Sequence, residues 1–192
     1  SINRIYVEKS IYETFVEKFV AETKKLRIGN GLADPDVDLG PMVSLEALEK
    51  VKEHIEDAVQ KGATVLCGGK KPEGEQYVKG YFFEPTVVVD VTHDMLIMKE
   101  ETFGPAVGIM PFENLSDAIA WSNATRYGLA AYVYTSSLEK ARTICLGLEC
   151  GNIGLNNVDV ATIYAPYTGW KESGFGTDLG PEGILSYLEM KH

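Results

Sequence analysis

The chain has 192 residues, of which 45% are hydrophobic and 10% aromatic, and its formal net charge is -10. This length allows one sizeable domain with a buried core, and the composition argues against disorder. The negative charge disfavours nucleic acid and anionic membrane surfaces as partners. No apolar run approaches the roughly 18 residues that a bilayer span requires.

The first half of the chain predicts a strand followed by two helices. Residues 3–7 are typical of a strand, and a helix follows from about Ser10, where Ser10 and Glu13 have the spacing of a capping box. Ser44 is placed to cap a second helix, whose apolar positions recur at helical spacing up to residue 59. Gly62 is expected to end that helix, because glycine tolerates a left-handed backbone.

Two predicted strands come next, and from residue 106 the predicted strands alternate with helices. Ser136 and Glu139 repeat the capping-box spacing, and the dipeptide at 180–181 places proline at the start of a last short helix. β-Branched or apolar runs predict strands at residues 63–67, 85–90, 106–110, 131–134 and 152–156. This order favours an α/β fold with a mainly parallel sheet and helices on both faces.

The cysteines and histidines offer no obvious catalytic group. The chain has 3 cysteines, Cys67, Cys145 and Cys150, and no CxxC spacing. Neither a disulfide framework nor a zinc or other metal site is therefore expected, and a reducing, cytoplasmic setting fits best. None of the cysteines has a histidine in an evident motif, because His54 is expected on a solvated helix face and His93 in a turn.

The most informative segment is residues 99–105, which read Lys-Glu-Glu-Thr-Phe-Gly-Pro directly before a predicted strand. A carboxylate two positions before an aromatic ring, on a backbone stiffened by proline, can bind a hydroxylated ring and stack against its flat neighbour. The plain alternative is a charged helix end followed by a turn. Glu101 and Phe103 are the candidate binding residues of this segment.

This segment resembles the Glu-Glu-x-Phe-Gly-Pro signature of the aldehyde dehydrogenase superfamily. Four further segments resemble that family in the same order and spacing: residues 3–7, 39–42, 127–131 and 169–176. The resemblance implies the catalytic-domain fold of that family. It also implies that Glu101 binds the nicotinamide ribose of NAD or NADP, and that Phe103 supports the nicotinamide ring.

One loop departs from the family pattern. The family usually has Pro-Phe-Gly-Gly ahead of a lysine, whereas residues 166–169 read Pro-Tyr-Thr-Gly. Tyr167 thus replaces a ring that commonly lines the aldehyde tunnel, and its hydroxyl needs a partner. The resemblance also places Asp159 near this tunnel, as a second substrate residue. Polar loop groups that cap the sheet edge are the alternative for both residues.

The mechanism that the resemblance implies is covalent. A cysteine thiolate attacks the aldehyde, the thiohemiacetal passes hydride to NAD or NADP, and water hydrolyses the thioester to release a carboxylic acid. By the family register the nucleophile falls about two positions before Ser1. The general-base glutamate, the oxyanion asparagine and the nucleotide-binding domain are also expected upstream. No catalytic residue is therefore expected within this chain, which is predicted to be inactive alone.

The resemblance also suggests domain limits, partners and an alternative. Residues 1–192 are interpreted as a single catalytic-domain fragment, with 161–192 as loop and tail contacting other domains or subunits. Residues 51–70 most resemble the succinate-semialdehyde branch, so the expected partners are a small aldehyde substrate and further copies of the chain, contacted through 185–192. The rival interpretation is a truncated, non-catalytic homologue that acts as an oligomerisation or interaction module.

Overall fold

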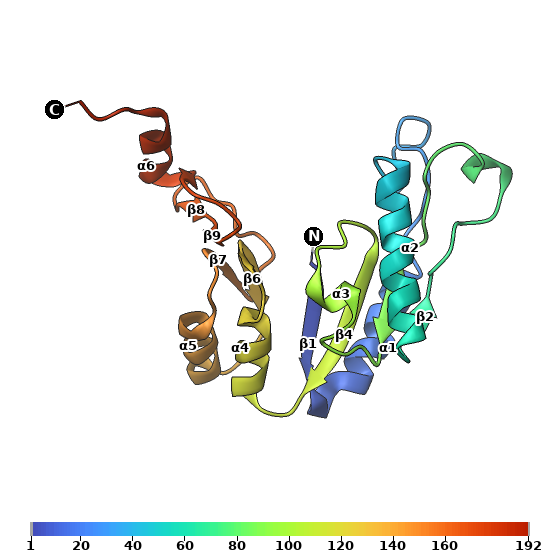
Figure 1. Cartoon of the computed structure of the whole chain (residues 1–192), viewed down its shortest axis with the longest axis horizontal. Coiled ribbons are helices and arrows are strands. Elements are labelled where there is room, and N and C mark those ends of the chain that lie inside the picture. The colour runs from blue at the N-terminus through green and yellow to red at the C-terminus, as the bar shows by residue number, and fades with distance from the viewer. Residues whose placement is uncertain (1, 192) are drawn as a thin grey trace. The chain divides into compact units, whose positions relative to one another are not determined.

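The structure is a computed structural model of the chain and describes residues 2–191. The chain forms two compact units, Ser1–Glu113 and Asn114–His192 (Figure 1). Each unit has its own strands and helices. The predicted assignment of residues 1–192 to one catalytic domain stays a prediction.

The first unit is built on a four-stranded sheet in the order β1-β4-β3-β2. Its strands are β1 (Arg4–Glu8), β2 (Thr64–Cys67), β3 (Thr86–Val89) and β4 (Ala106–Phe112). Strands β1, β4 and β3 run parallel, and β2 pairs with β3 in the antiparallel direction at one edge. The sheet is therefore mixed but mainly parallel, as the strand and helix order predicts.

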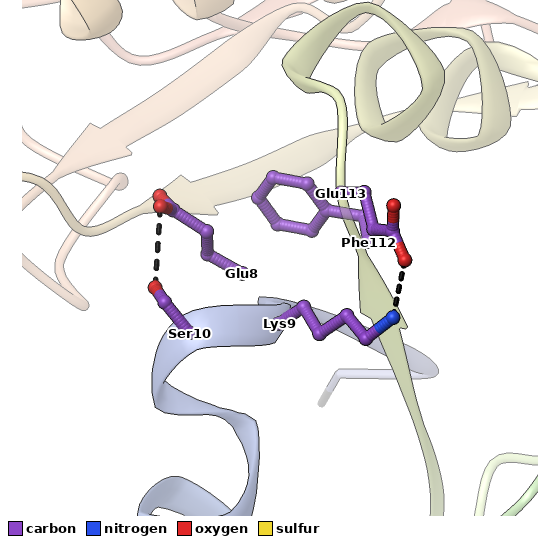
Figure 2. A pocket seen from close by; sticks show the side chains of 5 residues that line it. All are labelled: Glu8, Lys9, Ser10, Phe112 and Glu113. Atoms are coloured by element: carbon purple, nitrogen blue, oxygen red, sulfur yellow. Dashed lines mark hydrogen bonds and ion pairs between the residues drawn. The ribbon is translucent and has the colours of Figure 1, made fainter.

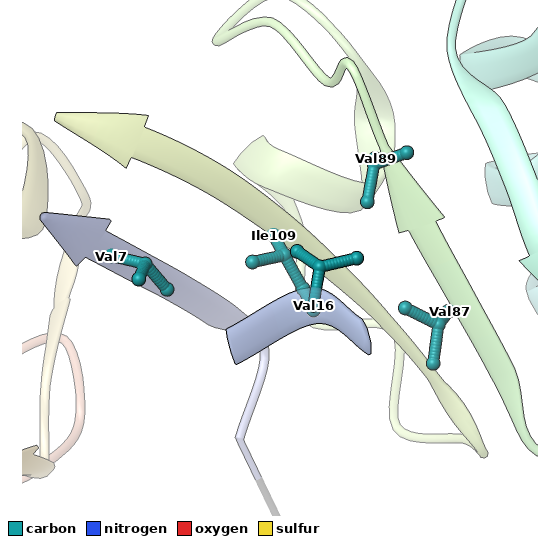
Figure 3. Packing of buried hydrophobic residues seen from close by; sticks show 5 residues of the cluster. All are labelled: Val7, Val16, Val87, Val89 and Ile109. Carbon is teal, nitrogen blue, oxygen red and sulfur yellow. The ribbon is translucent and has the colours of Figure 1, made fainter. Parts of the chain in front are cut away.

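One face of this sheet is covered by α1 (Tyr12–Thr23), which follows a 3-10 turn at Lys9–Ile11. Val16 of α1 packs against inward-facing residues of three strands, and Figure 3 shows this cluster of Val7, Val16, Val87, Val89 and Ile109. All five side chains are buried. Burial of apolar side chains between helix and sheet is the main stabilising contribution to this layer.

The opposite face carries α2 (Leu45–Gln60) and the short α3 (Leu96–Lys99). Gly108 lies on this face, and a Cβ atom built on it would be only 2.8 Å from Sδ of Met98 in α3. The Leu96 backbone N–H donates a 2.8 Å hydrogen bond to Asp57 of α2, so the two helices are joined directly. Helices therefore cover both faces of the sheet, as expected.

The second unit contains a parallel pair of strands and several short elements. Strands β6 (Ala130–Val133) and β7 (Asn152–Leu155) pair in parallel through the intervening α5 (Leu138–Gly147), and α4 (Leu115–Asn123) precedes them. Two antiparallel pairs join β5 with β9 and β8 with β10. The short elements of this unit are β5 (Tyr127–Gly128), β8 (Tyr167–Thr168), β9 (Trp170–Lys171), β10 (Thr177–Asp178), α6 (Gly180–Gly183) and a 3-10 turn at Ile184–Tyr187. The first unit has a further 3-10 turn at Glu75–Tyr77.

Local helix signals were only partly correct. The Ser44 hydroxyl accepts a 3.2 Å hydrogen bond from the Ala47 N–H, which confirms the cap of α2. The capping box at Ser10 is wrong, because the 3-10 turn occupies this position and the Ser10 hydroxyl donates to Glu8 instead. The cap of α5 is Ser137, one residue later than the predicted Ser136.

The placement of His54 on a solvated face is also wrong. His54 lies in α2 and is only 1% exposed. The signal for burial was in the sequence, since His54 follows the buried Val51 by three positions and precedes the buried Ala58 by four. A polar residue inside an apolar stripe needs a hydrogen-bond partner, which only the folded structure reveals.

Replacing Ser44 by alanine tests the cap that the structure does contain. Ser44→Ala should lower the free energy of unfolding by about 1 kcal/mol, because the Ala47 N–H loses its acceptor. Ser10→Ala is the matched control and should change the free energy of unfolding by less than about 0.5 kcal/mol. Urea unfolding of both variants measures the difference. Equal losses would contradict this assignment.

Candidate cofactor-binding site

The candidate residues Glu101 and Phe103 lie in the loop between α3 and β4. Within this loop the exposure alternates, since Glu101 is exposed, Thr102 is 2% exposed and Phe103 is 68% exposed. Thr102 is therefore held inside the unit while both of its neighbours face outward, and neither candidate side chain is packed inside the unit.

Phe103 has an unusual backbone conformation for a non-glycine residue, with φ of 51°. This left-handed region is costly for residues that carry a Cβ atom, and it persists when neighbouring contacts determine it. On the C-terminal side, the Pro105 carbonyl accepts a 2.7 Å hydrogen bond from the Thr86 N–H at the start of β3. The loop is thus fixed to the sheet immediately after the aromatic ring.

Thr102 is anchored on α2 by a buried hydrogen bond. Its Oγ1 lies 3.0 Å from Nδ1 of His54, and both side chains are buried. The Nε2 atom of the same ring lies 3.8 Å from a carboxylate oxygen of Glu100. That distance is too long for a hydrogen bond but places the carboxylate in electrostatic range.

The buried environment keeps His54 neutral near pH 7. Burial lowers the pKa of His54 from its ordinary value, and the positive charge of Lys50 lowers it further. The carboxylates of Glu100, Glu53 and Asp57 act in the opposite direction, but more weakly than burial.

Gly104 makes the closest approach between the loop and α2. A Cβ atom at this position would lie 2.3 Å from Cγ2 of Val51, far inside van der Waals contact. Val51 is fully buried and β-branched, so its side chain cannot rotate away at low cost. Glycine is thus the only residue that allows the loop to pass this close to the helix.

Three residues of α2 therefore hold the segment that ends in this loop. Asp57 accepts from Leu96, His54 bonds Thr102, and Val51 contacts Gly104. Positions 51, 54 and 57 follow one another at intervals of three residues, or roughly 4.5 Å along the axis. Asp57 also forms a 2.8 Å ion pair with Lys61, and this bond lowers the pKa of the Asp57 carboxyl.

The two predicted substrate residues belong to the second unit. Asp159 is exposed in the loop after β7, where its carboxylate accepts a hydrogen bond from the Ala161 N–H and its own N–H donates to Asn157. Tyr167 is half-buried in β8, opposite Asp178 of β10. Their assignment to an aldehyde tunnel stays a prediction.

A hollow in the first unit lies at the carboxyl ends of strands β1 and β4, and the charged side chains that line it have partners within it. Figure 2 shows the side chains that line it, in which Ser10 bonds Glu8 and Lys9 pairs with Glu113 beside Phe112. These residues lie at or just beyond the carboxyl ends of β1 and β4. Strand β4 has 7 residues, so its two ends lie roughly 20 Å apart, and the hollow is separate from the Glu101 loop.

The thiols have no sign of activation. All three cysteines are free and half-buried. Burial raises the pKa of Cys67 and of Cys150 above the ordinary value of a thiol, which disfavours the reactive thiolate. Between residues 2 and 191, no group of three or more His, Cys, Asp or Glu side chains could hold a metal ion. No helix in this range is long and apolar enough to cross a membrane.

Comparison with known proteins now identifies the family. The family model described as "Aldehyde dehydrogenase family" matches residues 1–192. The chain belongs to the aldehyde dehydrogenase family. The prediction drawn from residues 99–105 and the four further segments is thereby confirmed.

Individual aldehyde dehydrogenases match over only part of their length. A probable succinate-semialdehyde dehydrogenase [NADP(+)] of Sinorhizobium fredii is 42% identical over 192 residues, which are 100% of this chain and 38% of that protein. The glutarate-semialdehyde dehydrogenase of Pseudomonas putida is 43% identical over 99% of this chain and 38% of its own length. The chain thus spans little more than a third of these relatives.

A solved structure confirms the fold. Betaine aldehyde dehydrogenase of Staphylococcus aureus, determined in complex with NAD+, superposes with a TM-score of 0.91 at 37% identity. The superposition covers 97% of this chain and 37% of that structure. Relatives of this chain therefore use NAD or NADP.

Replacing Gly104 tests the close approach of the loop to α2. Gly104→Ala should lower the free energy of unfolding by about 1–3 kcal/mol, because the new methyl group overlaps Val51. Gly40→Ala is the control, since a Cβ atom there meets nothing within 4 Å. Thermal unfolding of both variants gives the comparison. A Gly104→Ala variant as stable as the Gly40→Ala variant would show that the loop is not held against the helix.

Proposed function

We propose that the intact protein oxidises an aldehyde to a carboxylic acid with NAD+ or NADP+. The observation that carries this proposal is the anchored loop, in which Thr102 is buried while Glu101 and Phe103 face outward. An exposed carboxylate and an exposed ring two positions apart suit a ribose hydroxyl and the flat nicotinamide next to it. Family membership of the whole chain supports the same assignment.

The proposed roles of the two residues are binding and orientation. Glu101 accepts hydrogen bonds from the nicotinamide ribose, and Phe103 limits the motion of the nicotinamide ring. When bound, the nicotinamide supplies the hydride acceptor that the oxidation requires. The backbone of Phe103 is already fixed by its neighbours, so little freedom remains to be lost on binding.

The nucleophile is proposed to be a cysteine outside this chain. Its thiolate attacks the aldehyde, and the resulting thioester is hydrolysed by water. Cys67 and Cys150 are poor candidates because burial raises their pKa values. Cys145 is half-buried in α5, without a histidine in an evident motif. The chain alone is therefore proposed to be inactive. The free cysteines fit a cytoplasmic setting.

The proposed substrate class is an aldehyde that carries a carboxylate at its other end. The names of two relatives, a succinate-semialdehyde and a glutarate-semialdehyde dehydrogenase, support this choice. Asp159 and Tyr167 are proposed to lie near the substrate. An assay of the intact protein against aldehydes with and without a distal carboxylate, with NAD+ and NADP+ in turn, tests both choices. Equal turnover of both aldehyde classes would contradict the proposed substrate.

Removal of the Glu101 charge tests the proposed cofactor contact. In the intact enzyme, Glu101→Gln should raise the KM for NAD(P)+ roughly tenfold, because a hydrogen bond to a charged acceptor is weakened. The KM for the aldehyde should change less than about twofold. Steady-state kinetics with each substrate varied in turn measures both. Glu113→Gln is the control, because Glu113 follows the carboxyl end of β4 and the Glu101 loop precedes the other end of this strand. This variant should leave both KM values unchanged.

A second candidate function, an oligomerisation module, is favoured by the C-terminal segment. Ile184, Leu185 and Tyr187 are 64%, 63% and 82% exposed. An apolar segment of this kind is typical of a contact surface. Homo-oligomerisation through residues 185–192 fits both candidates. Catalysis by the intact protein separates them, because the module would bind copies of itself without oxidising any aldehyde.

The isolated chain should therefore self-associate. Light scattering should give a mass above that of one chain, increasing with protein concentration, because exposed apolar side chains favour association. Leu185→Glu should shift the distribution toward the monomer, whereas Leu32→Glu, at an exposed loop position, is the control. A strictly monomeric chain at high concentration would contradict the proposed contact.

A further inference from the structure

His54 is the most deeply buried ionisable side chain near the loop, and the proposed reaction gives it no role. It is 1% exposed and lies one helical turn from Val51, in the stripe of α2 that faces the loop. Burying an imidazole is unfavourable unless its nitrogens find partners. A leucine at this position would fill the same stripe without needing a hydrogen-bond partner.

The surroundings of His54 favour one tautomer of its ring. The Glu100 carboxylate, 3.8 Å from Nε2, favours a proton on that nitrogen. In that tautomer of the neutral ring, Nδ1 would accept the hydrogen bond from the Thr102 hydroxyl, which lies 3.0 Å away. The imidazole thus hydrogen-bonds Thr102 and lies within electrostatic range of Glu100, and these two loop residues stand on either side of Glu101.

The orientation of Glu101 and Phe103 depends on Thr102 remaining buried. In the observed loop Thr102 faces α2, where it is 2% exposed, while Phe103 is 68% exposed and Glu101 is also exposed. Without the hydrogen bond to His54, the Thr102 hydroxyl would be better solvated in water than in an apolar contact. Release of Thr102 would therefore leave its two exposed neighbours without a fixed direction.

We propose that His54 is a positioning residue for the cofactor, holding the loop through Thr102 so that Glu101 and Phe103 face the bound NAD(P)+. This inference rests on the proposed function. By this inference, α2 controls the affinity for the cofactor, although this helix carries none of the proposed binding side chains. Within this chain, the proposed contact with the cofactor is made by the loop and not by α2.

The test is a double-mutant cycle in the intact enzyme. His54→Leu and Thr102→Val should each weaken binding of NAD(P)+ roughly fivefold, because each removes the same hydrogen bond. The double variant should bind no more weakly than the worse single variant, since the two changes share one interaction. The Kd for NAD(P)+ is measured by calorimetry without aldehyde, and the KM for the aldehyde should stay within about twofold of wild type.

Conservative variants and a destabilised control separate positioning from general destabilisation. His54→Asn places an amide where Nδ1 lies, and Thr102→Ser keeps the hydroxyl, so both should bind NAD(P)+ within about twofold of wild type. Val16→Ala removes methyl groups from the cluster on the opposite face of the sheet. It should lower the melting temperature while leaving the Kd for NAD(P)+ unchanged.

The outcomes distinguish this inference from the proposed function. If wild type binds NAD(P)+ and oxidises an aldehyde while His54→Leu and Thr102→Val bind the cofactor equally well, the positioning role is wrong and the function stands. Additive effects in the double variant, or an equal loss with Val16→Ala, would also overturn it. A wild-type protein that neither binds NAD(P)+ nor turns over aldehydes would contradict the proposed function, and this inference with it.

Discussion

The structure of the candidate site depends on one helix holding one loop. Residues at 51, 54 and 57 of α2 contact the segment from Leu96 to Gly104, and the buried hydrogen bond between His54 and Thr102 stands at its centre. Buried polar groups are costly when left unpaired, so this bond fixes a single arrangement of the loop. The exposed positions of Glu101 and Phe103 follow from that arrangement.

Much of this unit could be predicted from local sequence signals. The cap at Ser44, the apolar stripe of α2 and the β-branched strands gave the correct elements, because each depends on residues near in sequence. Residues 99–105 identified the family and the candidate loop. The mainly parallel sheet agrees with the prediction made from the overall order of strands and helices.

What the sequence could not supply was the contact between distant segments. His54 and Thr102 are separated by 48 positions, and no local pattern pairs them. The left-handed backbone of Phe103 and the approach of Gly104 to Val51 are also set by tertiary packing. At Ser10 a 3-10 turn replaced the predicted capping box, because the chain leaving β1 had already turned before α1 begins at Tyr12.

The most direct test is a structure of the intact protein with NAD(P)+ bound. We expect the Glu101 carboxylate within hydrogen-bond distance of the nicotinamide ribose, the Phe103 ring against the nicotinamide, and Thr102 still bonded to His54. A complex in which the ribose and the nicotinamide contact neither Glu101 nor Phe103 would contradict this expectation.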